Sequence, residues 1–105
     1  ALTYAKMLTQ ARYAIVVCGD VARSSYWYLD CSAATQNILL TAEALGLGAV
    51  WTAAYPYEDR IDVVRQNTGL PEKIVPLCVI PIGYPDGPQK AKDKFDPQRV
   101  HRNKY

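Results

Sequence analysis

The sequence predicts a single layered domain of the α/β or α+β class. Segments with strand patterns alternate along the chain with segments that have helical patterns, as in layered folds. The chain has 105 residues, of which 50% are hydrophobic and 21% charged, a size and composition typical of one soluble globular domain. It contains no internal repeat and no low-complexity tract. One hydrophobic core is therefore expected.

The first part of the chain predicts a helix, a strand and a loop. Helix-forming residues run from Leu2 to Ala11. The continuous apolar run Ala14–Cys18 follows, closed by a glycine, and a run that is apolar on both faces is typical of a central buried strand. Val21–Tyr28, which includes the aromatic stretch SSYWY, shows no period and is expected to be a loop.

The longest helical pattern runs from Cys31 to Leu45. Asp30 is a plausible N-cap before it, and Gly46 is a plausible stop after it. Apolar residues recur at helical spacing, and many of them are alanines, so the helix surface is small and nearly uncharged. Such a helix is usually buried on more than one side. It is expected to lie either in the core of one subunit or at the seam between two.

The second half predicts two strands, a helix and a tail. Gly48–Thr52 reads as a short strand, and Asp59–Asn67 reads as a helix that ends at Gly69. Ile74–Gly83 is a third strand, whose prolines imply either an edge position or places where no ladder donor is needed. From Tyr84 onward the chain is polar, basic and rich in proline, and residues 85–105 are expected to form an extended basic tail.

Charge and hydropathy exclude several classes of protein. The net charge of +2 is too small to indicate a nucleic-acid partner. No stretch approaches the roughly 20 apolar residues of a membrane span, and no signal peptide opens the chain. The sequence opens with Ala1 and runs directly into a helical pattern, so the beginning of the protein is expected to lie elsewhere.

The cysteines indicate a reducing compartment. Three of them, with no CxxC spacing, are best explained as free thiols, which favours the cytosol. The single histidine, His101, lies in the polar tail, so the ligands for a metal site are lacking. We therefore expect a cytoplasmic protein without a metal site.

Side-chain catalysis has little support in the sequence. A Ser-His-acid set would have to use His101, which stands among arginines in the tail. The carboxylates Glu58, Asp59 and Asp62 begin a helix, where capping and the helix dipole explain them. The glycines of Gly46–Gly48 follow a helix and precede a strand, the reverse of the order in a dinucleotide-binding loop.

Two places in the chain have unusual residue patterns. Trp51, Thr52, Ala53 and Ala54 end a strand, and small residues there would let backbone N–H groups approach a flat ligand. Alternatively, Trp51 is a core aromatic residue and the alanines make room for a helix. Three lysines, Lys90, Lys92 and Lys94, alternate in the tail beside Phe95. They are either a solvated basic surface or a clamp for a phosphate group.

Three segments of the chain resemble the FMN-dependent nitroreductase family. They are DCSAATQNILLTAEALGLGAVWT, LPEKIVPLCVIPIGYP and KAKDKFDPQRVH. GLGAVWT and PIGYP, in this order and spacing, are fairly specific to the family. The resemblance covers essentially the whole chain and corresponds to the C-terminal two-thirds of a family member. It implies a layered α+β domain with the α/β/α nitroreductase fold over residues 1–105, and homodimers with FMN at the subunit interface.

The resemblance also implies roles for particular residues. Trp51, Thr52, Ala53 and Ala54 match the segment that lies against the isoalloxazine ring, with a backbone N–H around Ala53 or Ala54 directed to flavin N5. Lys92 and Lys94 match a basic-x-basic element that reaches the flavin phosphate. A lysine at position 94, where the family often has arginine, keeps the charge but loses the bidentate fork, which suggests weaker anchoring. Helix 31–45 matches the central helix of the dimer.

The function implied by the resemblance is oxidoreduction. NAD(P)H would reduce FMN, leave, and be replaced by a nitroaromatic or quinone-type acceptor in a ping-pong cycle, without nucleic acid or membrane. The arginine-rich and asparagine-rich segments that begin family members are not among the 105 residues. Either this chain is a piece of a longer protein or it does not bind flavin tightly. A non-catalytic dimerising or flavin-binding remnant of the fold is the alternative, and flavin-dependent dehalogenation or ring fragmentation is a third possibility.

Overall fold

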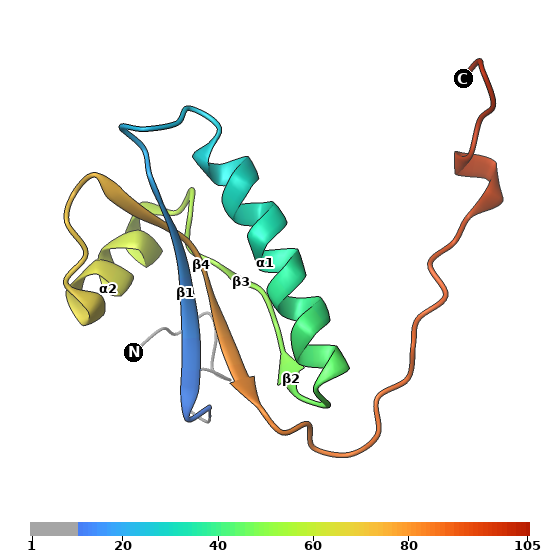
Figure 1. The fold of residues 1–105 in the computed structure, drawn as a ribbon, viewed down its shortest axis with the longest axis horizontal. Helices are drawn as coiled ribbons and strands as arrows, with labels where there is room; N and C mark the ends of the chain where they lie inside the picture. The colour runs from blue at the N-terminus through green and yellow to red at the C-terminus, as the bar shows by residue number, and fades with distance from the viewer. Residues whose placement is uncertain (1–10) are drawn as a thin grey trace.

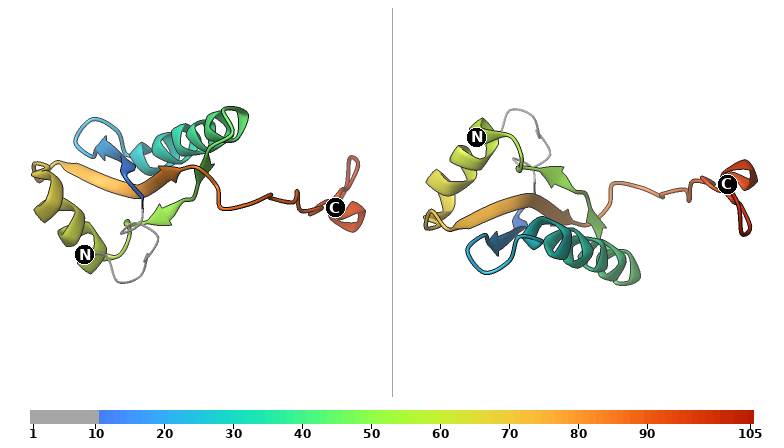
Figure 2. Two further views of the ribbon diagram at one scale, coloured as in Figure 1. Left: turned by 90° about the horizontal axis from the view of Figure 1, so that it is seen from below. Right: turned by 90° about the horizontal axis from the view of Figure 1, so that it is seen from above.

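The structure is a computed structural model that describes residues 11–105, so the expected helix Leu2–Ala11 lies outside the described residues except for its last residue. Its elements, in chain order, are β1 (Tyr13–Asp20), α1 (Trp27–Ala44), β2 (Gly48–Ala49), β3 (Thr52–Ala53), α2 (Glu58–Thr68), β4 (Ile74–Gly83) and the 3-10 helix η2 (Pro97–Arg99). All strand pairs are antiparallel. Figures 1 and 2 show α1 on one face of the sheet and α2 on the other, which confirms the layered α+β class.

The strand at the centre of the sheet is β4, not β1. β4 pairs with β1 along one edge and with the short β2 and β3 along the other. Ile80 packs beneath α1 with Trp27, whereas Val79 packs beneath α2 with Ile61, so two small cores lie on opposite faces of β4. The expectation that Ala14–Cys18 is the central buried strand is therefore wrong.

β1 lies at an edge among the strands that the structure describes, and its first half is open to solvent. Tyr13 is 74% exposed and Ile15 is 39% exposed. A continuous apolar run predicts burial on two faces, but it does not show which of two such runs pairs on both sides. That choice depends on contacts between residues far apart in sequence.

The prolines of β4 stand where the sheet lacks a partner for an N–H group. In the register that pairs Ala49 with Ile82 and Thr52 with Val79, Pro81 faces Val50, which lies in the break between β2 and β3. Pro76 pairs with Cys18 at the bulge in the β1–β4 ladder. The prolines therefore occupy positions where no ladder donor is needed, which is the second of the two alternatives from the sequence, and β4 is not an edge strand. The predicted strand Gly48–Thr52 is consequently divided into β2 and β3.

α1 begins four residues earlier than predicted. Its first residue is Trp27, and the N-cap Tyr26 makes no side-chain capping bond, while Asp30 lies in the first turn. Because no side chain caps the helix before Trp27, the preference of aspartate for the N-cap position led to a predicted start just after Asp30, which is too late. The side chain of Trp27 belongs to the core beneath α1, so the stretch SSYWY is only partly a loop.

Both helices end at the glycines that the sequence predicts. Gly46 has a φ of 75°, and the Leu47 N–H donates to the Ala42 carbonyl at 2.8 Å, which is a Schellman motif. Gly69 has a φ of 72°, and its N–H donates to the Arg65 carbonyl at 2.8 Å. Positive φ is accessible to glycine without strain, so these stops are local and readable from sequence.

Gly19 of β1 lies in close contact with α1. A Cβ atom at this position would lie 3.0 Å from Trp27 Cε3 and 3.2 Å from Cys31 Sγ. We expect Gly19→Ala to destabilise the fold by about 1–3 kcal/mol, because neither the buried indole nor the helix can move freely. Gly83→Ala is the matched control, since a Cβ there meets nothing within 4 Å. The urea concentration at the midpoint of unfolding is measured for both variants. Equal midpoints for Gly19→Ala and Gly83→Ala would contradict the prediction.

The chain after β4 leads away from the sheet. Residues 84–105 are exposed throughout and contain only the short η2. Figure 1 shows this segment as a long extended arm, with the C-terminus far from both helices. Among the described residues, no helix is long and apolar enough to cross a membrane.

Candidate functional site

The predicted ring-binding segment lies on β3 and at its two ends. The Ala54 N–H donates to the Leu77 carbonyl at 2.9 Å, and the Thr52 hydroxyl donates to the Val79 carbonyl at 2.5 Å. Ala54 is 0% exposed and packs against Ile61 of α2. The Ala54 amide is thus already bonded within the sheet, so it is not free to meet a ligand.

The Ala53 amide has the opposite direction. Along an antiparallel strand, successive residues turn their backbone groups to alternate edges. Since the Ala54 N–H points to β4, the Ala53 N–H points away from it. β3 has β4 as its single strand neighbour within residues 11–105, so this second edge is open there. Of the two amides that the resemblance suggests, Ala53 is the one with an unpaired direction.

The side chains of the segment separate the two alternatives for Trp51. Trp51 is 38% exposed and belongs to neither hydrophobic core of the described chain. The core tryptophan is instead Trp27. Ala54 does make room for a helix, since its methyl group lies against α2. The core interpretation is thus right for Ala54 but not for Trp51, whose indole remains partly available.

The structure does not bring the tail lysines to β3. Lys92 and Lys94 are exposed and belong to the extended arm that leaves the sheet (Figure 1). The arm makes local bonds instead, such as the Phe95 N–H to Asp93 Oδ1 at 3.1 Å. In a single copy with the arm in this course, the two parts of the predicted site are separate.

Two of the three cysteines, Cys31 and Cys78, lie in the core between α1 and the sheet, whereas Cys18 of β1 is half-buried. All are free; burial raises the pKa of Cys31 and of Cys78, so both stay protonated near neutral pH. The Thr35 hydroxyl, fully buried, donates to the Cys31 carbonyl at 2.8 Å and lies 3.4 Å from Cys78 Sγ. Among the described residues, no group of three or more potential ligands is placed to hold a metal ion. These thiols contribute to packing.

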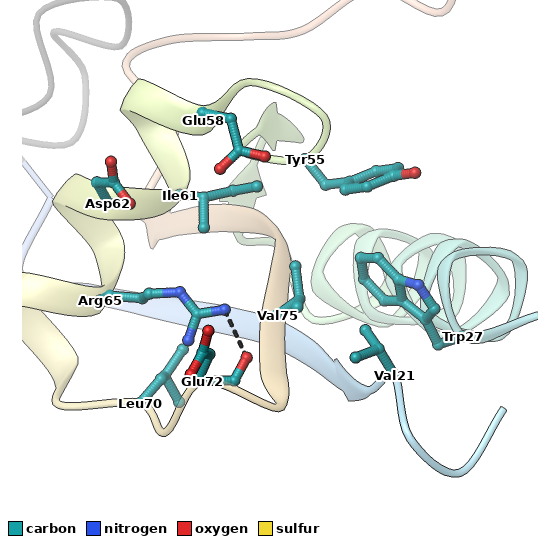
Figure 3. A pocket seen from close by; sticks show the side chains of 10 residues that line it. All are labelled: Val21, Trp27, Tyr55, Glu58, Ile61, Asp62, Arg65, Leu70, Glu72 and Val75. Carbon is teal, nitrogen blue, oxygen red and sulfur yellow. Dashed lines mark hydrogen bonds between the residues drawn. The ribbon is translucent and has the colours of Figure 1, made fainter. Parts of the chain in front are cut away.

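An aromatic groove that the sequence did not suggest begins one residue after Ala54. Its volume is about 550 Å³. Figure 3 shows its lining residues between the start of α1 and α2. The Tyr55 ring lies edge-to-face on Trp27 at 4.8 Å and is stacked with Tyr28 at 6.0 Å. The signal for it was present, because tyrosine and tryptophan are frequent in SSYWY and in the segment after Ala54. However, only the fold brings these two segments together.

Comparisons with known proteins show which family the chain resembles. The sequence model of the nitroreductase family matches residues 1–84. A protein of Methanothermobacter thermautotrophicus, which carries the assigned name NADH dehydrogenase/NAD(P)H nitroreductase, is 47% identical over 105 residues. The match covers 97% of this chain and 55% of that protein.

Solved structures give the same result. A crystal structure from Bacteroides thetaiotaomicron with the same assigned name superposes with a TM-score of 0.96 at 70% identity, covering 100% of this chain and 62% of the other. An FMN-dependent nitroreductase of Clostridium difficile superposes with a TM-score of 0.82 at 33% identity, covering 90% of this chain and 59% of the other. The chain therefore spans less than two-thirds of the length of these relatives.

Proposed function

This chain belongs to the nitroreductase family, and from that premise we propose that it is part of an FMN-dependent oxidoreductase that transfers a hydride from NAD(P)H to a nitroaromatic or quinone-type acceptor. The observation that carries the proposal is the outward-facing Ala53 amide beside a partly exposed Trp51. The names of the relatives, including an FMN-dependent nitroreductase, support the same chemistry. The segment Trp51–Ala54 contains no histidine or carboxylate, which fits a reaction whose chemistry is carried by the cofactor and not by an acid or base side chain.

The residues of β3 fit a flat cofactor with a hydrogen-bond acceptor at its edge. The Ala53 N–H would donate to the ring, and the small side chain of Ala53 would keep the approach open. The bond from Ala54 to Leu77 and the bond from Thr52 to Val79 hold this part of the backbone in place, so the donor is positioned before any ligand arrives. When bound, FMN supplies the two-electron chemistry, and the protein supplies position and electrostatics.

Lys92 and Lys94 would hold the phosphate group. In the extended course of the arm they cannot reach β3 of their own sheet, so this role requires the arm to lie against the site of a second copy or to fold back. Lysine acts on a phosphate as a point charge and needs no fixed fork geometry, which suits a segment that docks late. The three free thiols favour a reducing compartment, and we propose that the protein is cytoplasmic.

The visible absorption spectrum of the purified protein tests the proposal. An oxidoreductase of this kind is expected to show the flavin band, and NADPH or NADH is expected to bleach it. A colourless protein that stays colourless after incubation with FMN would favour the alternative, a non-catalytic remnant of the fold. The observation that speaks for the remnant is the separation of the tail lysines from β3 in a single copy.

We also propose that α1 is the seam of a homodimer. Its outer face carries the apolar residues Leu29, Ala33, Leu40 and Ala44 around Gln36, all of them exposed in the single chain. These residues recur at helical spacing and lie on one side of α1, opposite the stripe that packs on the sheet. Exposed apolar surface of this kind is typical of an interface. The expected dimer helix 31–45 is thereby extended to the start of α1.

Leu40→Glu should convert the dimer to a monomer. Leu40 is 58% exposed in the single chain, and a carboxylate at the centre of an apolar seam would stay unpaired, which weakens association roughly a hundredfold or more. Leu45→Glu is the matched control, because Leu45 is exposed to a similar degree but lies on another side of the helix end. Sedimentation velocity measures both. A Leu40→Glu protein that remains dimeric would place the seam elsewhere.

A further inference from the structure

The aromatic groove is formed by segments from five parts of the chain. Val21 comes from the loop after β1, Trp27 from α1 and Tyr55 from the loop after β3. Glu58, Ile61, Asp62 and Arg65 come from α2, and Leu70, Glu72 and Val75 from the connection to β4 and its start. Figure 3 shows Ile61 and Val75 between the charged residues of α2 on one side and Trp27 on the other. The groove therefore has an apolar floor between an aromatic wall and a charged wall.

The aromatic wall presents a ring to the groove. Trp27 is nearly buried and supports Tyr55 edge-to-face, while Tyr55 itself is 37% exposed. Tyr28 stacks with Tyr55 at an interplanar angle of 24°. A tyrosine ring held by two other rings loses little conformational entropy when a flat ligand stacks on it. Its electron-rich face also attracts cations.

The charged wall is negative. Three carboxylates, those of Glu58, Asp62 and Glu72, line the groove against one guanidinium, that of Arg65. Arg65 is committed to backbone oxygen atoms, because its Nη1 donates to the Pro71 carbonyl at 2.7 Å and its Nη2 to the Glu72 carbonyl at 2.9 Å. The ion pairs of Asp20 with Arg23 and of Asp96 with Arg99 involve none of these three carboxylates. Among the described residues, the groove is thus lined by more carboxylates than guanidinium groups, beside an aromatic face.

From this arrangement we propose that the groove binds a flat, positively charged organic molecule, with its ring on Tyr55 and its charge toward Glu58 and Asp62. The apolar floor disfavours small hydrated ions, and the carboxylates disfavour a ring that itself carries negative charge. Tyr55 directly follows Ala54, so the groove begins at the end of the proposed cofactor segment. If the proposed function holds, the molecule in the groove is the electron acceptor, and the protein prefers cationic or uncharged acceptors to anionic ones.

N-methylacridinium and acridine form a matched pair of probes, since both are flat and tricyclic but acridine is uncharged at pH 8. Titration calorimetry with the purified protein at low salt should show saturable binding of N-methylacridinium that is at least tenfold tighter than that of acridine. Several exposed carboxylates and one cation–π contact together account for a difference of that size. Acridine-9-carboxylate is expected not to bind measurably. Equal affinities for the cation and the neutral ring would overturn the proposal.

Variants locate the binding. Glu58→Gln with Asp62→Asn should weaken N-methylacridinium about tenfold and acridine less than twofold, and Tyr55→Leu should weaken both probes. The control removes the same charge from α1, through Asp30→Asn with Glu43→Gln, and should change the affinity less than twofold. If this control weakens the cation as much as the groove variant, only the net charge of the protein attracts it and the groove is not a site.

The outcome is separate from that of the proposed function. A colourless protein that binds N-methylacridinium in the groove would contradict the flavin proposal and support the proposed groove site. A protein with a flavin band that NADPH bleaches, but with no saturable binding of the cation, would support the flavin proposal and contradict the groove proposal.

Discussion

Ala53→Pro is expected to slow the bleaching of the flavin band by NADPH roughly a hundredfold while the protein remains folded. Proline has no N–H group, so the substitution deletes the donor that the site is proposed to aim at the cofactor. The fold should tolerate it, because the Ala53 N–H points to the open edge of β3 and not to β4. Proline is accepted in edge strands when its nitrogen faces outward. Thr52 before it is already extended, as the residue preceding a proline requires.

Two neighbouring substitutions make the test specific. Ala53→Ser keeps the N–H and should retain most of the reduction rate. Ala54→Pro removes the 2.9 Å bond to the Leu77 carbonyl, so it should lower the thermal unfolding temperature, which Ala53→Pro should leave nearly unchanged. Stopped-flow absorbance gives the rates, and circular dichroism gives the unfolding temperatures. An Ala53→Pro protein with the bleaching rate of the parent would mean that the donor to the ring lies elsewhere.

Local signals in the sequence predicted several elements well. β4 has the predicted bounds, Ile74–Gly83, and both helices end at glycines with positive φ. Each of these features depends on residues within one or two turns of chain. The two helix stops are examples, because a left-handed residue after a helix is nearly always glycine whatever surrounds it.

The pairing of distant segments could not be predicted in the same way. Ala14–Cys18 and the apolar part of β4 look alike as sequences, and only the presence of β2 and β3 beside β4 makes β4 the central strand. Trp27 was assigned to a loop because α1 begins there without a capping side chain. The groove between Trp27 and Tyr55 could not be predicted for the same two reasons. The segments that form its walls come into contact only through the order of the strands in the sheet.

The site segment shows how far sequence and resemblance reach. Together they selected four residues, Trp51 to Ala54, but left two amides as candidates for the same donor. The hydrogen bond from Ala54 to Leu77 leaves Ala53 as the donor that we propose, because an amide that is paired within the sheet is not available to a ligand. A difference of one residue along a strand reverses the direction of the backbone groups, and no property of an alanine in the sequence records it.

The second large effect is expected in the tail, where Lys92→Ala combined with Lys94→Ala should weaken FMN retention in the intact protein. A charge-assisted contact to a phosphate is worth roughly a tenfold to a hundredfold change in affinity, so removal of two should release most of the cofactor during dialysis. The dissociation constant of FMN, measured by quenching of flavin fluorescence, gives the effect. Riboflavin, which lacks the phosphate, should bind parent and variant equally.

The matched control removes two other charges from the same arm, through Arg102→Ala with Lys104→Ala. If the alternation of Lys92 and Lys94 places both on one ligand, the control should change the FMN affinity less than threefold, a loss attributable to general screening. Equal losses in the two variants would show that the arm attracts FMN only through its net charge. No loss in either would mean that the arm is a solvated surface, as its exposure in the single chain suggests. The same FMN affinities, measured in the Leu40→Glu background, show which copy the arm contacts. If Lys92 and Lys94 act on the site of a second copy, their substitution has no effect in the monomer. If the arm folds back onto its own sheet, the effect remains.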